Sequence, residues 1–253
     1  MISKSQMKLV RSLEQKKHRR SEGLFVAEGP KVVGDLLAAG FITRMLFATN
    51  EWSRVGTAAV LPVQEVSGDE LRKLSFLQHP QQVLALFELP TPLASHGLRV
   101  GASAGISSPL SLALDGIQDP GNLGTIIRLA DWFGIGTIFC SEDTVDVWSP
   151  KVVQATMGSI ARVSIVYTDL AALLSNTTLP VYGTLLDGDD IYQQELSPEG
   201  IIVMGNEGNG ISAPIRQLIT RKLLIPKFHE GPESLNVAIA TAIVCSEFRR
   251  RRG

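Results

Sequence analysis

The second half of the chain alternates short, continuously apolar runs with segments of helical pattern. The clearest apolar runs lie at 111–117, 137–141, 201–204 and 223–225. A strand that is buried on both faces has this pattern, whereas a strand with one solvated face alternates apolar and polar residues. Helices between such strands are typical of a parallel sheet that is covered on both sides. We therefore expect an α/β domain with a parallel sheet over residues 110–253.

Local signals place the other elements of this half. Ser149 is a typical N-cap, and Pro150 suits the first turn of a helix. Two further strands are expected at 162–166 and 181–185. The expected helices lie at about 125–133, from Ser149 onward, at 169–175, after Ser212, and in a last segment that ends near Arg250.

The first 89 residues predict a smaller mixed α/β domain. The expected elements are strands at 24–29, 44–49 and 82–89, a basic amphipathic helix at 5–20, a helix at 30–39 and a short helix after Ser67. Ser67 and Glu70 have the spacing of a capping box. Residues 90–109 are rich in Pro, Gly, Ser and Ala, which is typical of a linker. We therefore expect domains at 1–89 and 110–253, joined by a linker at 90–109.

The net charge of −1 conceals two basic ends. Residues 4–20 hold seven Lys and Arg and one acid, and Arg249–Arg252 are four consecutive arginines. The two ends together carry 11 of the 24 basic residues. Clustered positive charge of this kind suits the phosphate backbone of a nucleic acid. Solubilising ends on a metabolic enzyme are the alternative, and the second cluster favours nucleic acid.

Several classes of protein and site are disfavoured by the composition. No apolar run reaches the roughly 18–20 residues that span a bilayer, and no apolar stretch follows the first basic residues as in a secretory signal. Cys140 and Cys245 lie in apolar contexts and are expected to be reduced core thiols, which fits a cytoplasmic location. The four histidines are scattered without metal-ligand spacing, so we expect no metal site.

Two glycine-containing segments follow expected strands of the second half. GNEGNGIS (205–212) is neither a dinucleotide fingerprint nor a P-loop, since its glycine order differs and it lacks the phosphate-binding Lys. A glycine-rich loop with a carboxylate, Glu207, is compatible with a sulfonium ligand; a tight turn is the alternative. In DPGNLGTIIR (119–128), Asn122 is interpreted as a helix N-cap or a site residue. Arg128 lies among apolar residues and needs an anionic partner, either Glu207 or a substrate phosphate.

A third segment, GPESLN (231–236), precedes the last apolar helix. Ser234 is a candidate helix cap, whereas Asn236 is a poor helix former and is a candidate to face a pocket. All three segments follow strands, and ligands of parallel sheets bind at the carboxyl ends of strands. The three segments are therefore expected to meet in one site.

The three segments, in this order, resemble the motifs of the SpoU family of RNA ribose 2'-O-methyltransferases, in the SPOUT class. DPGNLGTIIRLADWFG resembles the first motif, IIVMGNEGNGIS the second and IPKFHEGPESLNVAIATAI the third. The N-terminal LFVAEGPKVVGDLLAAG is similar to the small substrate-binding domain of the family, which has a ribosomal-protein-like RNA-binding fold. The resemblance covers nearly the whole chain.

The resemblance implies a parallel-sheet SPOUT domain whose C-terminal segment forms a deep trefoil knot, a homodimer, and S-adenosyl-L-methionine as cofactor. The cofactor contacts that it implies are Thr184, Gly205, Ile225 and Leu235. The polar catalytic set that it implies is Asn122, Arg128, Glu207, Ser234 and Asn236.

The implied reaction methylates a ribose 2'-hydroxyl of RNA. The family proposal for the motif 1 arginine makes Arg128 the base, assisted by an RNA phosphate; a clamp that orients phosphate and ribose is the alternative. The separate N-terminal domain favours ribosomal RNA over tRNA. A non-catalytic RNA-binding or ribosome-assembly protein of the same fold is a further alternative, against which the complete polar set argues. A small-molecule α/β enzyme is disfavoured by the basic ends.

Overall fold

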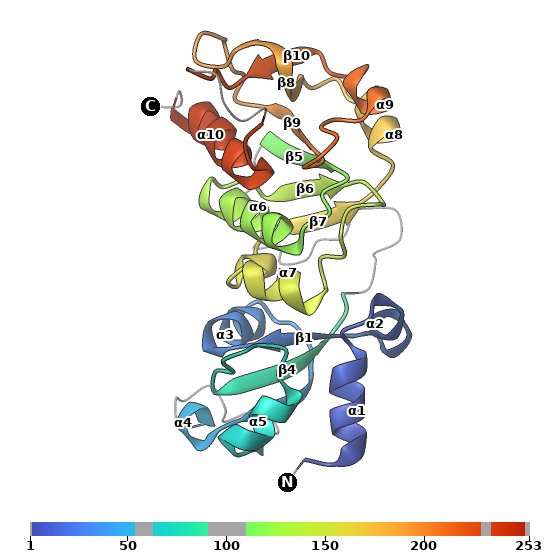
Figure 1. The fold of residues 1–253 in the computed structure, drawn as a ribbon, viewed down its shortest axis with the longest axis vertical. Coiled ribbons are helices and arrows are strands. Elements are labelled where there is room, and N and C mark those ends of the chain that lie inside the picture. The colour runs from blue at the N-terminus through green and yellow to red at the C-terminus, as the bar shows by residue number, and fades with distance from the viewer. Residues whose placement is uncertain (1, 54–62, 91–109, 229–233, 251–253) are drawn as a thin grey trace.

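The computed structural model describes residues 2–53, 63–90, 110–228 and 234–250, which form an elongated molecule with a separate sheet in each half (Figure 1). The small sheet belongs to the N-terminal part, and the large sheet belongs to the C-terminal part. The expected linker, 90–109, lies outside the described residues except for Pro90, so the domain boundary stays a prediction.

The small sheet has the strand order β1-β4-β2-β3, with β4 antiparallel to β1 and β2, and β3 parallel to β2. Its strands are β1 (Leu24–Glu28), β2 (Thr43–Ala48), β3 (Val63–Glu65) and β4 (Val83–Glu88). The accompanying helices are α1 (Lys4–Ser12), α2 (Lys16–Glu22), α3 (Pro30–Ala38), α4 (Asn50–Ser53) and α5 (Gly68–Leu74). The capping box of Ser67 and Glu70 at α5 is confirmed.

The large sheet is parallel throughout its six strands, as expected from the continuous apolar runs. Its order is β10-β8-β9-β5-β6-β7. The strands are β5 (Leu110–Asp115), β6 (Thr137–Cys140), β7 (Ser164–Tyr167), β8 (Val181–Asp190), β9 (Gly200–Gly205) and β10 (Arg221–Leu224).

Helices cover both faces of the large sheet. One face packs on α6 (Pro120–Trp132), α7 (Pro150–Ala155) and α10 (Val237–Arg250), and the other on α8 (Leu170–Ser175) and α9 (Ala213–Arg216) (Figure 1). A short 3-10 helix (Ser159–Ala161) follows α7. The expected reduced thiols of Cys140 and Cys245 are buried in this core without a disulfide, and burial raises the pKa of each to about 12.

The strand order reverses between β5 and β9. From β5 the chain moves outward through β6 and β7, and β9, β8 and β10 lie on the other side. Asp115 at the end of β5 lies opposite Gly205 at the end of β9. Loops that follow two such strands diverge to opposite faces, and the crevice between them is where open parallel sheets bind ligands.

Two predicted helices differ from the structure. The basic helix expected at 5–20 is two helices, because the chain breaks at Leu13–Gln15 and buries Leu13. Helix α6 starts at Pro120 instead of near residue 125, with Asp119 as its N-cap. Gly121, Asn122 and Gly124 have low helix propensity, but Gly124 lets α6 approach α7 so closely that a Cβ there would lie 2.3 Å from the Ala155 Cβ.

The two parts of the molecule share a continuous apolar contact. Phe25 of β1 packs on Trp148, which precedes α7, with ring centroids 4.5 Å apart. Buried Arg19 of α2 donates two hydrogen bonds to the Asp146 carboxylate and others to the Leu13 and Glu14 carbonyls. Arg19 therefore joins the two parts, and its buried guanidinium is not available to an external ligand.

Candidate active site at the switch point of the large sheet

The Glu207 carboxylate is the centre of a hydrogen-bonded cluster where β5 and β9 end. It accepts hydrogen bonds from the Asn122 side chain at 3.0 Å and from the backbone N–H groups of Gln118 and Asp119, both at 3.3 Å. Partial burial alone would raise the pKa of this carboxyl, but the hydrogen bonds outweigh it and hold the pKa below its ordinary value. Glu207 is therefore ionised at neutral pH.

Asn122 connects Glu207 to the start of the C-terminal helix α10. Its backbone N–H donates to the capping Asp119 side chain at 2.8 Å, so Asn122 lies in the first turn of α6 and is not the N-cap. Its side-chain oxygen accepts a hydrogen bond from the Asn236 side chain at 2.9 Å. The two ends of the Asn122 amide therefore connect the second and third sequence segments.

Asn236 is the N-cap of α10. Its side-chain oxygen accepts hydrogen bonds from the backbone N–H groups of Ala238 at 2.9 Å and Ile239 at 3.2 Å. The cap expected from Ser234 is therefore supplied by Asn236. The Ser234 residue is exposed two positions earlier. The Asn236 amide thus caps the N-terminus of α10 and also hydrogen-bonds to Asn122 of α6.

The glycine-rich loop is a tight turn that also exposes its backbone. Asn206 pairs with Gly210, and its side chain accepts from the N–H groups of Gly208 and Asn209 and donates to the Gly116 carbonyl. A Cβ on Gly205 would lie 2.3 Å from the backbone of Gly210, so this position admits only glycine without rearrangement. The loop thereby presents exposed backbone at the crevice.

Arg128 lies apart from this cluster. It is exposed on α6, and within the described part of the chain its guanidinium has no hydrogen bond or ion pair. Glu207 is bound by Asn122 and backbone groups instead, so of the two partners expected for Arg128 the structural carboxylate is excluded. An exposed cationic side chain without a protein partner suits an anionic ligand.

Of the four residues expected to contact the cofactor, Gly205 and Ile225 lie at the carboxyl ends of β9 and β10. Thr184 lies in β8 where the pairing with β10 is displaced, and its hydroxyl contacts the Met204 sulfur. Gly205 ends β9, and Ile225 follows β10 as a half-buried residue that packs on the core. Leu235 precedes Asn236 and is 52% exposed.

This arrangement fits S-adenosylmethionine. The ionised Glu207 suits a sulfonium cation, the exposed backbone of the 206–210 loop offers donors and acceptors, and the incompletely buried Ile225 and Leu235 offer apolar surface for a purine ring. Within the described ranges no group of three or more His, Cys, Asp or Glu side chains is arranged to hold a metal ion.

Sequence reasoning missed two groups that shape the crevice. The carboxylate of Asp115 accepts the Ser212 backbone N–H at 2.7 Å and so ties the end of β5 to the start of α9. The side chain of Gln118 donates to the Asp143 carbonyl at 2.6 Å and fixes the loop that offers its N–H to Glu207. A buried strand that ends in Asp was a signal for the first; no sequence signal pointed to the second.

The described helices include none that is both long and apolar enough to cross a membrane.

Comparison with known proteins agrees with this geometry. The SpoU rRNA Methylase family matches residues 109–246, and the MRM3-like substrate binding domain matches residues 4–85. A TrmH-family structure from Porphyromonas gingivalis is 42% identical, with a TM-score of 0.86 and 99% of both chains covered. An AdoMet-bound rRNA methyltransferase from Sinorhizobium meliloti is 32% identical, with a TM-score of 0.82 and 99% of this chain and 97% of the other covered.

A relative of known activity is also similar over nearly its full length. The 23S rRNA guanosine 2'-O-methyltransferase RlmP of Bacillus subtilis is 28% identical, with 94% of each chain covered. The SpoU match covers more than half of this chain and contains all of the candidate site. The chain therefore belongs to the SpoU rRNA methylase family.

Proposed function

We propose that this protein methylates a ribose 2'-hydroxyl of ribosomal RNA with S-adenosylmethionine as methyl donor. The observation that carries the proposal is the hydrogen-bonded chain of Glu207, Asn122 and Asn236, which joins three loops at the switch point of the sheet. The relatives named as ribosomal RNA 2'-O-methyltransferase and as AdoMet-bound rRNA methyltransferase support the substrate class and the cofactor.

The proposed cofactor contacts are Thr184, Gly205, Ile225 and Leu235. When bound, S-adenosylmethionine supplies a methyl group activated by its sulfonium charge. Glu207 contributes a fixed negative charge, and Asn122 and Asn236 hold the start of α10 beside it. Ser234 is exposed next to Leu235 and is proposed to bind the ribose or the cofactor. These residues thus act by orienting the reactants, which is a large part of catalysis for a group transfer.

Arg128 is proposed as a clamp for the RNA phosphate and ribose. Every N–H of a guanidinium donates, and the group stays protonated in proteins, so binding phosphate oxygens uses Arg128 as it is. The exposed Arg128 side chain without a protein partner supports this role. A role as general base would require the guanidinium to lose a proton next to a phosphate, which disfavours that loss.

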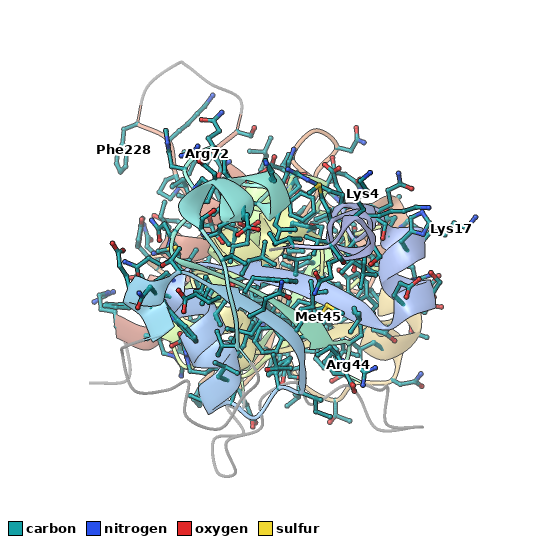
Figure 2. All side chains as sticks on the ribbon, turned by 90° about the horizontal axis from the view of Figure 1, so that it is seen from below. Lys4, Lys17, Arg44, Met45, Arg72 and Phe228 are labelled. Carbon is teal, nitrogen blue, oxygen red and sulfur yellow. The ribbon has the colours of Figure 1, made fainter. Side chains whose placement is uncertain are left out.

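The RNA is proposed to lie along a basic ridge on the small domain, defined as the exposed residues Lys4, Lys8, Lys16, Lys17 and Arg20 of α1 and α2. Figure 2 looks along the molecule from the N-terminal end and shows Lys4 and Lys17 on one side. The described C-terminal arginines are proposed to contribute less to RNA binding than the ridge, because they have protein partners. Arg249 donates to the Phe133 and Gly134 carbonyls at the end of α6, and Arg250 pairs with Glu247; Arg251 and Arg252 lie outside the described residues.

Two architectural features implied by the family are also proposed. The first is the deep trefoil knot, supported by a chain that returns from β10 at one edge of the sheet to pack α10 on α6. The second is a homodimer, supported by exposed apolar side chains on these two helices, Trp132 at 84% and Ile239 at 54%. Light scattering of the wild type and of Trp132→Glu tests the dimer, and a monomeric wild type would reject it.

The domain boundaries and the location are proposed as well. Domains at 1–89 and 110–253 with a linker at 90–109 agree with the two sheets, which share no strand. A cytoplasmic location is supported by the two buried thiols without a disulfide.

Calorimetry of the protein with S-adenosylmethionine tests the core of the proposal. The wild type is expected to bind the cofactor, and Leu235→Trp is expected to block the pocket without unfolding, because Leu235 is exposed. Methyl transfer to ribosomal RNA then tests the substrate. A folded wild type that binds no cofactor, with or without ribosomal RNA, would reject the methyltransferase; incorporation into tRNA alone would reject the ribosomal substrate.

A further inference from the structure

An open hollow of about 900 Å³ lies on the small domain, away from the candidate active site. Strands β1, β2 and β3 end beside it, and β4 begins there. The hollow is therefore built from the loops at one end of the small sheet, which are residues 49–51, 65–68 and 80–82 together with the start of α3. Its volume falls within the roughly 300–1,000 Å³ of small-ligand sites.

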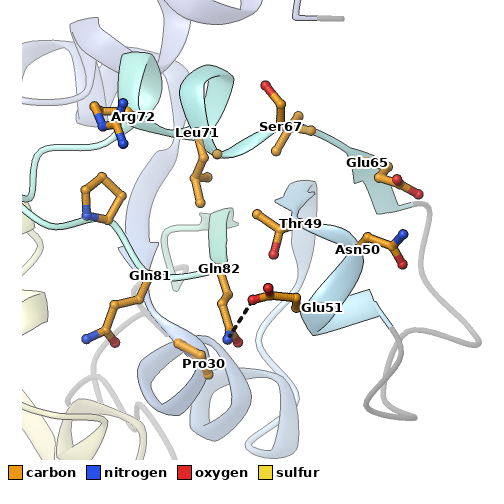
Figure 3. A pocket seen from close by; sticks show the side chains of 13 residues that line it. Pro30, Thr49, Asn50, Glu51, Glu65, Ser67, Leu71, Arg72, Gln81 and Gln82 are labelled. Atoms are coloured by element: carbon orange, nitrogen blue, oxygen red, sulfur yellow. Dashed lines mark hydrogen bonds between the residues drawn. The ribbon is translucent and has the colours of Figure 1, made fainter.

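The lining combines apolar surface with amide side chains. Leu71 and Val66 belong to the buried core, and Pro30 and Pro80 add apolar surface. Figure 3 shows Leu71 directed into the hollow, with Gln82 facing Glu51 and with the side chains of Asn50 and Gln81 on opposite sides, extending outward. Side-chain amides carry both donors and acceptors, and the apolar residues supply flat contact surface.

Gln82 is held at this hollow in a strained conformation. Its φ of 41° lies in the left-handed region, which residues other than glycine rarely adopt. Its carbonyl accepts the Thr49 N–H at 2.8 Å, and its side chain donates to Glu51 at 3.4 Å across the hollow (Figure 3). The fold thus fixes this amide at the edge of the hollow at a conformational cost, and such strain clusters at ligand sites.

We propose that this hollow binds an unpaired nucleobase of the RNA whose phosphates lie along the basic ridge. The proposal rests on the RNA-binding function proposed above. Proteins that read RNA mostly bind bases that have left the helical stack, with hydrogen bonds to the base edge and apolar or planar contacts to its face. The exposed amides of Asn50 and Gln81 provide the first, and the partly exposed Pro30 and Pro80 provide the second.

The charges around the hollow place the base inside and the phosphates outside. Glu51 and Glu65 line it and repel a phosphate group. Arg72 lies on α5 and is exposed, with Asp69 as its partner at 2.8 Å. Helix α5 packs beside α1, because Arg11 donates to the Lys73 carbonyl. Arg72 therefore adds a cation between the hollow and the ridge. An RNA strand that runs from α1 to the hollow would pass it.

Fluorescence anisotropy with two labelled RNA duplexes, identical except that one carries a single bulged nucleotide, tests the proposal at one fixed salt concentration. The wild type is expected to bind the bulged duplex at least about fivefold more tightly, the smallest factor that a good base contact gives. Gln81→Ala should remove most of this preference. Gln78→Ala is the matched control, because Gln78 is exposed nearby in the chain and does not line the hollow.

A second variant fills the hollow. Gly68 lines it, and a Cβ added there meets no atom within 4 Å, so Gly68→Trp is expected to fold and to bind both duplexes equally. Lys8→Ala on the ridge should weaken both duplexes by the same factor. A wild type that binds both duplexes equally would refute the proposal that the hollow binds a base. A Gly68→Trp protein that keeps the preference would refute it too. Neither result would count against RNA binding as such.

A photo-crosslinking experiment locates the bulged base on the protein directly. A 4-thiouridine at the bulge is expected to crosslink to residues 65–72 or 80–82, and crosslinks confined to the large domain would overturn the proposal. Binding of neither duplex would overturn it together with the RNA-binding function, whereas cofactor binding measured by calorimetry would still report separately on the methyltransferase.

Discussion

Substitution of Asn236 separates two tasks that one amide performs. Its oxygen caps α10 through two backbone N–H groups, and its nitrogen donates to Asn122. Asn236→Ala removes both. Loss of a helix cap costs about 1 kcal/mol, and loss of the second hydrogen bond costs about 0.5–1.5 kcal/mol, so we expect the free energy of unfolding to fall by about 1.5–2.5 kcal/mol.

Asn236→Asp keeps the cap and breaks the link. A carboxylate accepts the same two N–H groups, and its charge at the start of a helix adds about 0.3–1 kcal/mol of stability. It has no N–H for the Asn122 oxygen, which lies 2.9 Å away in the wild type. Asn122 cannot compensate by turning over, because its nitrogen would then leave Glu207 and its oxygen would face that carboxylate.

Urea unfolding and methyl transfer to ribosomal RNA distinguish the two tasks. Asn236→Asp should keep the wild-type unfolding midpoint and lose at least about tenfold in rate, the factor that corresponds to 1.4 kcal/mol of misplaced interaction. Full activity in this variant would refute the role of the link between α6 and α10. Unchanged stability in Asn236→Ala would refute the capping argument.

Three further predictions follow from individual side chains. Arg128→Ala should lose methyl transfer by at least about 100-fold and keep cofactor binding, with a pH–rate profile of unchanged shape; loss of one ionisation from that profile would favour the base role. Burial raises the pKa of Glu28 in spite of hydrogen bonds from Ser75 and the Phe76 N–H. Because the folded state holds this proton more tightly, stability should fall as pH rises from about the ordinary value of 4.5 through the raised pKa, and Glu28→Gln, measured by urea unfolding, should lack this fall. Arg249→Ala should lower the urea midpoint and leave the salt dependence of RNA binding almost unchanged, because its guanidinium binds two carbonyls at the end of α6; a flatter salt dependence would place Arg249 on the RNA.

The pattern of apolar runs was sufficient to predict the parallel sheet, because burial on both faces leaves a local trace in each strand. Helix boundaries were less predictable where distant contacts decide them. Helix α6 includes Gly124 where Ala155 packs against it. The break between α1 and α2 buries Leu13 and is bound by Arg19, which also binds Asp146, 127 residues away. Local propensity contains no information about either partner.

The three site segments were predicted to meet, and the structure brings Asn122, Glu207 and Asn236 together. Their pairing was not predictable. An ion pair between Glu207 and Arg128 was one of two alternatives, the other being a substrate phosphate. Glu207 binds an amide and two backbone N–H groups instead, and Arg128 is exposed. Spacing along the chain places side chains at the same edge of a sheet, but their directions follow from helix phase and packing.

The link between Asn122 and Asn236 also sets an order of events during translation. Asn236 follows Asn122 by 114 residues, which at 5–20 residues per second takes a ribosome roughly 6 to 23 seconds. During that interval the nascent chain contains Asn122, and later also Glu207, but it lacks Asn236 at the start of α10, which completes the chain of hydrogen bonds. The hydrogen-bonded cluster proposed to orient the reactants therefore cannot be complete until the start of α10 has been synthesised.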